Sequence, residues 1–560
     1  MADEAIINDA IRRAREHFAA GAIADAAIVI KQAIERTPDS HMLHVALAEA
    51  FIALGHAKEA VPVAERAIEL NRADPLTWRT LGIALVQSNQ AAQAQRRLAE
   101  LIRIAPDDPA AHHQLGDAAA VAGDLSAAAA ALRRAVELKP DYTDAWTRLG
   151  NVRRAQGDPD AAVDAFARAA AIDAKPDTLA NLGDALIAAA RPDEAVPPLE
   201  RALAMDPSHL VARINLGCAR MRQARVDEAI ADFEACLRLQ PDLPITHFYL
   251  ALALLKRGDY PRGWREFEWR FAASPASQVT RIHQSFPAWR GEPMERKTIL
   301  LHVEQGFGDQ IQMARFIPLV AARRPKRLIV ACKPTMRRLF QNISGVDEIV
   351  DVADALRATA DVQCAFMSLP LAFDTTLETI PAEVPYLSPP MELVAMWREK
   401  VSRASGTKIG LAWTGSPTNT MNRYRSCRFE DLAPILDAAG VTFFNLQVGA
   451  GIEQLRASPL ASRVIDLTAD LTDWADTAAL IANLDRVISI DTGIAHLAGA
   501  IGKPVWTMRS RAADWRYSLT PADRTPWYPT MTLFRQEEPG DWAGVTGRVA
   551  EALSRIEQAL

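Results

Sequence analysis

The chain has few cysteines and no long apolar run. Five cysteines are spread over 560 residues, without a Cys-x-x-Cys pair. This spacing argues against a disulfide framework or a common zinc site and is typical of reduced, buried thiols. No apolar run approaches the roughly 18 residues that a membrane span needs, and the first residues lack the basic segment of a signal peptide. We therefore expect a soluble, cytoplasmic protein.

Charge of either sign is not in large excess. The net charge is −6, and all of it lies before residue 273. Nucleic-acid binding needs a basic face, so this distribution argues against it. Apolar residues make up 49% of the chain and charged residues 24%, which are values of globular proteins. A chain of this length is too long to fold around one hydrophobic core, so we expect two to four domains.

Small residues recur about every 34 positions in the first half of the chain. Twelve residues after each of them comes a second small residue, and proline closes most units. The first residues of the series are Ala14, Ala48, Gly82, Gly116, Gly150, Gly183, Gly217 and Ala251. Helices that cross at small residues approach closely, but one pair cannot bury its apolar face, so units must stack. About eight units over residues 1–273 predict an all-α superhelix whose groove binds a peptide or protein surface.

This repeat resembles the tetratricopeptide repeat. Asn181 and Asn215 each precede a Leu-Gly pair. In the nucleocytoplasmic O-GlcNAc transferases, whose repeats are similar, asparagines at that position hold the backbone of the acceptor peptide. Thr80, Gln114 and Arg148 occupy the position in other repeats here. The two asparagines are therefore either acceptor-binding residues or ordinary polar surface residues.

The pattern changes after the last repeat. The aromatic helix expected over 260–271 predicts a cap that docks on the next domain, and residues 274–296 indicate a linker. Short apolar or β-branched runs then alternate with helical stretches, which predicts two doubly wound α/β lobes, 297–385 and 386–560. The expected strands are 299–303, 328–331, 348–352, 362–367, 409–413, 441–446, 464–467, 486–490 and 505–508. Ligands of such lobes bind beyond the carboxyl ends of strands.

Two strands are followed by a glycine-containing turn and a helix start. Gly306 and Gly308 follow the first strand, with Asp309 before a helix expected over 310–322. In the second lobe Asp491, Thr492 and Gly493 precede a helix that contains His496. Unpaired N–H groups and the helix dipole make such a start an anion site. The same pattern fits helix caps for both aspartates and a packed side chain for His496.

A further loop offers polar groups after the first strand of the second lobe. Thr414, Gly415, Ser416, Arg423 and Arg425 supply hydroxyls, backbone donors and two guanidinium groups suited to phosphate oxygens. An exposed basic loop is the alternative.

Three further features complete the expected site. Gln447 ends a later strand and is a candidate for reading a base or ribose edge. Lys503 and residues 514–516 are expected at the surface, with a position beside the cleft as the alternative. The second half holds no Asp-x-Asp pair, so we expect no metal site, and charge on a leaving group must be met by N–H groups and arginines.

These motifs carry a resemblance. Residues 308–312, 491–496 and 527–530 are similar to bacterial glycosyltransferases of the lipopolysaccharide heptosyltransferase type. With the repeats, the chain resembles bacterial tetratricopeptide-repeat proteins that carry such a domain, among them flagellin glycosyltransferases. The resemblance implies the two-lobed GT-B fold and an inverting transfer of a hexose or nonulosonic acid. It implies a nucleotide-sugar co-substrate and no other cofactor.

The resemblance also implies roles for single residues. Asp309 takes the position of the catalytic base, and Arg423 or Arg425 that of the residue on the donor phosphate. The expected donor-binding residues are Gly306, Gly308, Thr414, Gly415, Ser416, Arg423, Arg425, Gln447, Asp491, Thr492, Gly493 and His496.

The fusion of repeats to such a domain indicates a protein O-glycosyltransferase. Its repeats capture a protein acceptor, by family analogy flagellin. The alternatives are a scaffold with an inactive nucleotide-binding domain and a glycosyltransferase that acts on saccharides. The sequence does not select the nucleotide base, the sugar, the acceptor or the oligomeric state.

Overall fold

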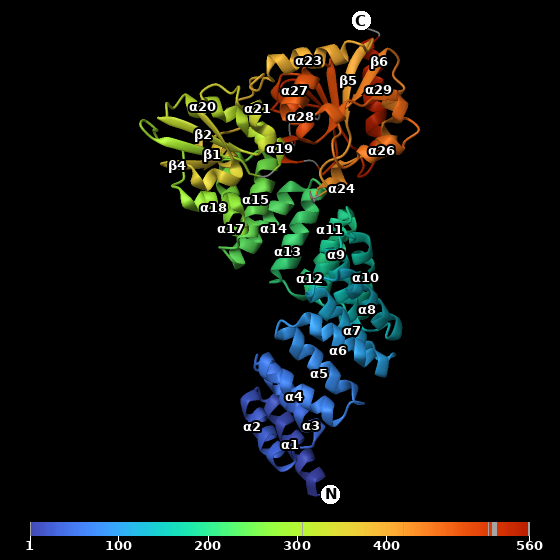
Figure 1. Cartoon of the computed structure of the whole chain (residues 1–560). Coiled ribbons are helices and arrows are strands. Elements are labelled where there is room, and N and C mark those ends of the chain that lie inside the picture. The colour runs from blue at the N-terminus through green and yellow to red at the C-terminus, as the bar shows by residue number, and fades with distance from the viewer. Residues whose placement is uncertain are drawn as a thin grey trace. The chain divides into compact units, whose positions relative to one another are not determined.

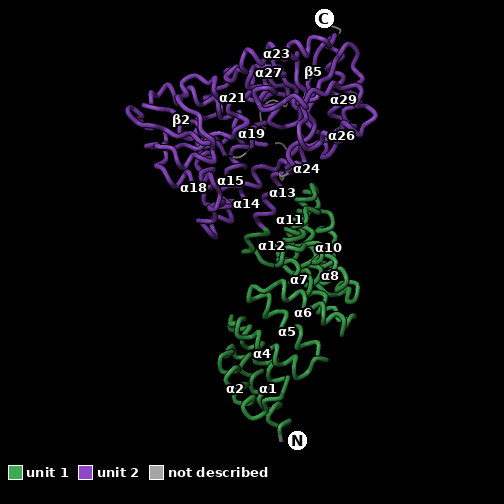
Figure 2. The backbone as a smooth tube through the Cα atoms, viewed as in Figure 1, with its two compact units in different colours: residues 1–212 green, residues 213–560 purple. Residues whose placement is uncertain are grey.

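The computed structural model describes residues 2–304, 306–417, 419, 421–512, 514–517 and 523–557. The chain divides into two compact units, residues 1–212 and 213–560 (Figure 2). The first unit is built from helices, and the second combines helices with two parallel sheets (Figure 1). The predicted combination of an all-α repeat array and an α/β region is confirmed.

Antiparallel helix pairs build the first unit. Its helices are α1 (Ala2–Ala19), α2 (Ile23–Arg36), α3 (His41–Ala53), α4 (Ala57–Leu70), α5 (Pro75–Gln87), α6 (Ala91–Ile104), α7 (Pro109–Val121), α8 (Leu125–Leu138), α9 (Thr143–Ala155), α10 (Pro159–Ile172), α11 (Pro176–Ala188) and α12 (Pro192–Met205). Several begin with proline in the first turn after an aspartate whose side chain accepts a backbone N–H, as at Asp74, Asp108 and Asp158.

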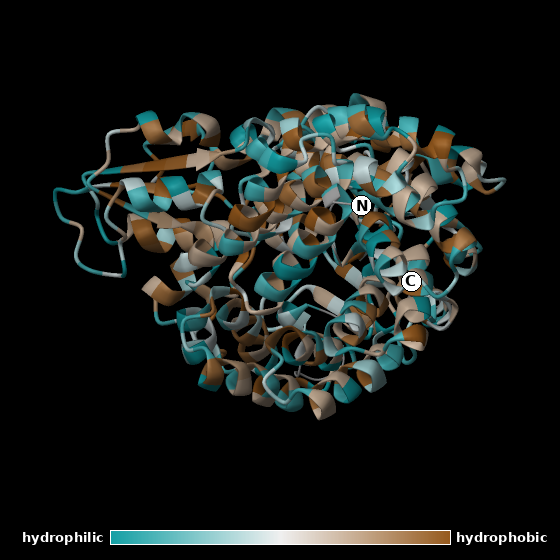
Figure 3. Cartoon of the chain, turned by 90° about the horizontal axis from the view of Figure 1, so that it is seen from below, coloured by the Kyte–Doolittle hydropathy of each residue, from teal (hydrophilic) through white to brown (hydrophobic). Residues whose placement is uncertain are grey.

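The recurring glycines lie where the two helices of a repeat cross. A Cβ atom on Gly82 would lie 2.8 Å from Leu98, and one on Gly116 would lie 2.5 Å from Leu132. These distances leave no room for a side chain, which explains the period seen in the sequence. The helices alternate between hydrophobic and hydrophilic segments along the ribbon in Figure 3, as expected for amphipathic helices that stack.

The second unit begins with the last helices of the array. These are α13 (Leu210–Arg222), α14 (Val226–Leu239), α15 (Pro244–Arg257), α16 (Tyr260–Phe267), α17 (Arg270–Ala273) and α18 (Gln278–Ser285). Trp264 of α16 is buried and meets Trp515 edge-on, with ring centroids 5.2 Å apart. The predicted docking of the last repeat on the following domain is confirmed.

Residues 274–296, expected as a linker, pack on the first sheet. They contain helix α18, whose Ile282 is fully buried against the first sheet, and Ala288 forms a parallel bridge with Gln363. The stretch therefore forms part of the first lobe's packing. The domain limits given above stay a prediction.

The first lobe holds a four-stranded parallel sheet in the order β3-β2-β1-β4. Its strands are β1 (Thr298–His302), β2 (Arg327–Cys332), β3 (Glu348–Asp351) and β4 (Val362–Ala365). The second lobe holds a six-stranded parallel sheet in the order β10-β9-β8-β5-β6-β7. Its strands are β5 (Thr407–Ala412), β6 (Val441–Asn445), β7 (Val464–Ile465), β8 (Arg486–Ile490), β9 (Val505–Arg509) and β10 (Met531–Arg535).

Helices cover both sheets. They are α19 (Phe307–Met313), α20 (Ile317–Ala321), α21 (Arg337–Phe340), α22 (Leu369–Ala372), α23 (Met391–Val401), α24 (Asn422–Arg425), α25 (Ala433–Leu436), α26 (Ile452–Ala457), α27 (Trp474–Ala482), α28 (Gly493–Ala500) and α29 (Trp542–Glu557). The single helix expected over 310–322 is instead α19, a 3-10 turn and α20. Pro318 explains the new start, because proline fits the first turn of a helix and not its interior.

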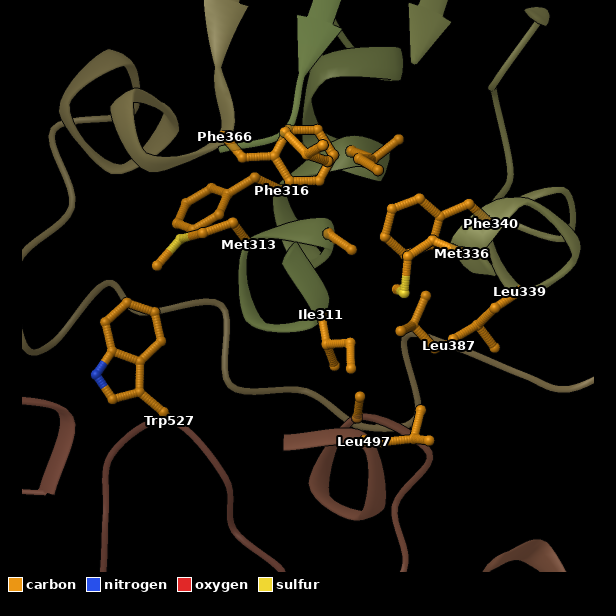
Figure 4. Packing of buried hydrophobic residues seen from close by; sticks show 14 of the residues in the cluster. Ile311, Met313, Phe316, Met336, Leu339, Phe340, Phe366, Leu387, Leu497 and Trp527 are labelled. Atoms are coloured by element: carbon orange, nitrogen blue, oxygen red, sulfur yellow. The ribbon is translucent and has the colours of Figure 1, made fainter. Parts of the chain in front are cut away.

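The two lobes share one apolar cluster. Figure 4 shows Ile311, Met313 and Phe316, from α19 and the turn after it, in one cluster with Leu497 and Trp527 of the second lobe. Helices α19 and α28 pack on each other. This contact brings the helix start after β1 next to the helix start after β8.

Candidate functional site

The turn after β1 presents Asp309 in the first turn of α19. The backbone N–H of Gly306 donates to Oδ2 of Asp309 over 2.9 Å. Asp309 therefore does cap its helix, which is the structural role that the sequence left open. Its second oxygen, Oδ1, accepts from the guanidinium of Arg516 in the second lobe. Capping thus leaves one carboxylate oxygen directed across the junction of the lobes.

The turn after β8 presents a helix start without a side-chain cap. Thr492 is the N-cap residue of α28, but its side chain accepts no bond from the helix and lies 3.1 Å from the Ser489 hydroxyl. The first N–H groups of α28 keep their positive partial charge. A Cβ on Gly493 would lie 2.6 Å from the Trp474 ring, so glycine is required there.

Gly308 and His496 lie close together where α19 packs on α28. A Cβ on Gly308 would lie 2.7 Å from Cδ2 of His496. Nδ1 of His496 is 2.9 Å from the Tyr528 hydroxyl, and Nε2 is 3.4 Å from the Tyr517 hydroxyl. Burial, together with Arg516 and other arginines, holds the pKa of His496 well below its usual range, so the ring is neutral.

Asp491 belongs to the same hydrogen-bonded group. The Tyr517 hydroxyl donates to its Oδ1 over 2.9 Å, and Nε2 of His496 lies 3.8 Å from that oxygen. Burial and the neighbouring Asp514 raise the pKa of Asp491, whereas Arg425 and Arg516 oppose this shift. Burial likewise raises the pKa of Asp309 against the effect of Arg516.

The loop after β5 contributes one of its two arginines. The guanidinium of Arg425 lies on Gly415, where a Cβ would be 2.7 Å from Nη2. Its positive charge lowers the pKa of both Asp491 and His496. Arg423 and Ser416 are exposed, whereas Thr414 and Gly415 are buried.

A serine further along the loop holds the buried part of this segment. The Ser426 side chain accepts from the Gly415 N–H over 3.1 Å and lies 3.2 Å from the Thr414 hydroxyl. Because Arg423 is exposed and the charge of Arg425 acts on Asp491 and His496, Arg425 is the better placed of the two expected phosphate ligands.

The structure favours a structural role for Gln447. Its Oε1 accepts from the backbone N–H groups of Trp413 and Thr414, at 3.2 and 3.1 Å, and its Nε2 donates to the Ala450 carbonyl over 2.8 Å. These bonds hold the end of β5 and the turn after β6 together. The side chain is thereby engaged within its own lobe.

Arg516 and Lys503, both expected at the surface, are buried and half-buried. Arg516 is 7% exposed and contacts both lobes, so the expectation of a surface position for this segment is wrong. Lys503 is half-buried and donates to the carbonyls of Ala482, the last residue of α27, and of Leu484 just after it. Contacts with residues far away in the sequence, to side chains for Arg516 and to backbone carbonyls for Lys503, decide both positions. The local sequence carries no sign of them.

The asparagines expected in the repeat groove lie on two helices. Asn181 is half-buried on α11 of the first unit, and Asn215 is half-buried on α13 of the second. Their role in acceptor binding stays a prediction. Within the described ranges no three His, Cys, Asp or Glu side chains are grouped as a metal site would need. In the same part of the chain, no helix is long and apolar enough to cross a bilayer.

A repeat array followed by two parallel sheets, with helix starts from both lobes in contact, defines a repeat protein with a C-terminal two-lobed α/β domain. Comparison with protein families agrees with this class. Residues 405–518 match glycosyltransferase family 9 (heptosyltransferase). Tetratricopeptide-repeat models match residues 11–75, 52–116, 113–177, 180–244 and 214–263. The chain therefore carries tetratricopeptide repeats and a C-terminal glycosyltransferase family 9 domain.

Relatives match parts of the chain. Protein FlbA of Caulobacter vibrioides is 30% identical over 325 residues, which cover 53% of this chain and 52% of FlbA. The chain thus spans about half the length of this relative. YrrB, described as a TPR protein with an unusual peptide-binding site, is 22% identical over 33% of this chain and 97% of its own, with a TM-score of 0.28. PilF of Pseudomonas aeruginosa is 16% identical over 38% and 97%, with a TM-score of 0.33.

Proposed function

We propose that the protein is an O-glycosyltransferase that moves a sugar from a nucleotide-activated donor to Ser or Thr of a protein acceptor. Residues 1–273 would hold the acceptor, and the lobes 297–385 and 386–560 would carry out the transfer. The observation that carries the proposal is the contact of α19 with α28. It brings Asp309 of one lobe to the uncapped helix start of the other.

Asp309 is the group proposed to accept the proton of the acceptor hydroxyl. The hydroxyl oxygen forms a bond to the anomeric carbon while the bond from that carbon to the nucleotide phosphate breaks. The electron pair leaves with the phosphate, and the proton passes to the carboxylate. Attack from the side opposite to the leaving group inverts the configuration. An ordinary Asp with pKa about 3.9 is a weak base, and burial raises the pKa of this one.

The positive groups of the second lobe are proposed to receive the leaving phosphate. They are the first N–H groups of α28, with Thr492 and Gly493, and the guanidinium of Arg425, whose loop begins at Thr414 and Gly415. Each preorganised donor of this kind contributes on the order of 10²–10³ in rate. Gly306 completes the donor side, with Asp491 fixed by Tyr517. The mechanism uses no metal, so we expect transfer to continue in excess chelator.

The repeats supply the argument for a protein acceptor. Stacked repeats of this kind form surfaces that bind peptides and proteins, and a transferase for saccharides has no use for them. Asn181 and Asn215 are the proposed contacts to the acceptor backbone. By resemblance, flagellin is the proposed acceptor and a hexose or nonulosonic acid the sugar. Nucleotide sugars are cytoplasmic compounds, which places the proposed reaction in the cytoplasm.

Intact mass spectrometry of candidate acceptors tests the proposal. The purified chain is incubated with flagellin or a lysate fraction and a panel of UDP-, GDP-, ADP- and CMP-linked sugars. We expect one added sugar mass per modified site with the wild type and none with Asp309→Asn. Addition to oligosaccharides but not to proteins would instead support a saccharide-directed transferase.

Asp473→Asn is a matched control for Asp309→Asn. Asp473 also caps a helix, α27, and also pairs with an arginine of the other lobe, since Arg338 donates to it over 2.6 Å. It lies outside the proposed site. We expect Asp473→Asn to lower stability and keep transfer, so that loss of transfer in Asp309→Asn reports chemistry.

An inactive nucleotide-binding scaffold is the second candidate function. It is favoured by one observation: both oxygens of Asp309 are already engaged, by Gly306 and Arg516. Thermal-shift measurements with nucleoside diphosphates and CMP, followed by the mass assay, separate the two. Stabilisation by a nucleotide without any mass increase would identify the scaffold.

A further inference from the structure

Arg516 joins the two lobes at the proposed site. It lies in a short 3-10 helix, residues 515–517, and is 7% exposed. Its Nη2 donates to Oδ1 of Asp309 and its Nε donates to Oε1 of Gln312, both in α19. Its Nη1 donates to Oδ1 of Asp514 over 2.7 Å. All three guanidinium nitrogens therefore have acceptors, and two of those acceptors belong to the other lobe.

The last repeat holds the segment that carries Arg516. Trp515 meets Trp264 of α16 edge-on at 5.2 Å, and Trp264 is 1% exposed. Further along, Trp527 stacks on Tyr260 at 6.1 Å and donates its Nε1–H to the Tyr260 hydroxyl over 3.0 Å. The hydroxyl of Thr525, two residues before Trp527, donates to the Arg516 carbonyl over 2.8 Å. Helix α16 thus contacts Trp515, which precedes Arg516, and Trp527, which follows the residue pair Thr525 and Pro526 near Arg516.

Arg516 opposes the groups that raise the pKa of Asp309. The negative charges of Asp514 and Glu304 raise the pKa of Asp309, the positive charge of Arg516 lowers it, and the nearby ring of His496 is neutral. Burial adds to the effect of the two carboxylates, and Arg516 is the largest opposing influence. A carboxyl group in that setting without its arginine takes up a proton more readily.

We propose that Arg516 is a positioning residue that keeps Asp309 ionised and oriented, and that α16 of the last repeat holds Arg516 in place. The inference rests on the proposed function, because it takes Asp309 as the base. The repeat array is then part of the catalytic unit as well as a binding module, and its last helix pair cannot be removed without loss of transfer.

The pH dependence of kcat/KM in the full chain tests the role of Arg516. The assay uses the acceptor and the nucleotide sugar from the panel above that supports transfer. Transfer needs the carboxylate form, so activity falls as the pH falls through the pKa of Asp309. Removing the arginine raises that pKa, so in Arg516→Met we expect the acid limb to move up by about one pH unit or more. Arg516→Lys should restore part of the shift.

Arg511→Met is the matched control. Arg511 lies five residues earlier, is only partly buried and pairs with Glu538. Its acid limb should coincide with that of the wild type. An acid limb in Arg516→Met that also coincides with the wild type would overturn the inference. If Asp309→Asn keeps transfer, the proposed base itself is wrong; if it abolishes transfer and Arg516→Met shows no shift, the inference alone fails.

A stability measurement tests the same pair without substrate. A double-mutant cycle of Asp309→Asn and Arg516→Met by urea unfolding should give a favourable coupling at pH 7 that weakens as Asp309 becomes protonated at acid pH. Zero coupling at pH 7 would contradict the inference.

Substitutions in two repeats test the contribution of α16. Trp264→Leu should shift the acid limb in the same direction as Arg516→Met. Trp78 is an equally buried tryptophan of the first unit, and Trp78→Leu should lower stability without moving the acid limb. An unshifted acid limb in Trp264→Leu would refute the role given to α16.

Discussion

The substitution Gly308→Ala tests the close contact between α19 and α28. The new Cβ would lie 2.7 Å from Cδ2 and 3.3 Å from Nε2 of His496, about 0.7 Å closer than an ordinary contact to the nearer atom. His496 cannot retreat freely, because its Nδ1 is held 2.9 Å from the Tyr528 hydroxyl. The Tyr528 ring lies against Gly499, where a Cβ would be 2.5 Å away. We therefore expect α19 to move away from α28.

The expected loss of stability has two sources, overpacking and one weakened hydrogen bond. Insertion of a methyl group into a packed contact costs about 1–3 kcal/mol, and loss of the bond between His496 and Tyr528 would add about 0.5–1.5 kcal/mol. Because Asp309 is the next residue, the shift also displaces the proposed base. A displacement of a catalytic group by about 1 Å lowers the rate of transfer by up to about 100-fold.

Urea unfolding and the transfer assay measure the two effects. Gly547→Ala is the control, since nothing lies within 4 Å of a Cβ at that helical position, and it should gain about 0.5–1 kcal/mol. Wild-type stability together with wild-type transfer in Gly308→Ala would refute the tight contact between the two helix starts.

Two buried cations give further predictions. Burial and neighbouring arginines lower the pKa of Lys256 to about 7, so the unfolded chain binds one more proton between that pH and about 10.5. Wild-type stability should rise there by up to about 1.4 kcal/mol per pH unit, and Lys256→Met should lose this rise; an equal rise in both proteins would contradict it. Arg270→Met leaves Glu304 buried without the guanidinium that pairs with it at 2.8 Å, and should cost about 3–5 kcal/mol in urea unfolding. The exposed pair of Arg327 and Glu348 is its control, since Arg327→Met should cost less than about 1 kcal/mol, and a similar cost at both positions would argue against the burial effect.

Much of the architecture could be predicted because it follows from local periodicity. The glycines at the crossing of each helix pair repeat at the spacing that the packing requires, as Gly82 and Gly116 show. Buried parallel strands appear as short apolar or β-branched runs, and the sequence predicts nine of them. Strand β10 was missed because it is an edge strand that pairs with β9 alone, and its buried positions alternate with half-buried ones.

The site was less predictable, because contacts between distant residues decide it. The turns at Gly306 and Asp491 are visible in the sequence as glycine and cap residues after a strand. Arg516 meets Asp309 across 207 positions of the chain, and its local sequence resembles a polar surface segment. Gln447 has the residue type of a base-reading side chain, but its backbone bonds appear only in the folded lobe. The exposure of Arg423 beside the inward Arg425 likewise depends on the loop's fold.

The most direct test of the proposed function is the intact mass of a protein acceptor after incubation with the full chain and a nucleotide sugar. We predict a mass increase of one sugar per modified Ser or Thr with the wild type and with Asp473→Asn, and no increase with Asp309→Asn. An unchanged acceptor mass with every donor of the panel, or an equal increase with Asp309→Asn, would contradict the proposed function.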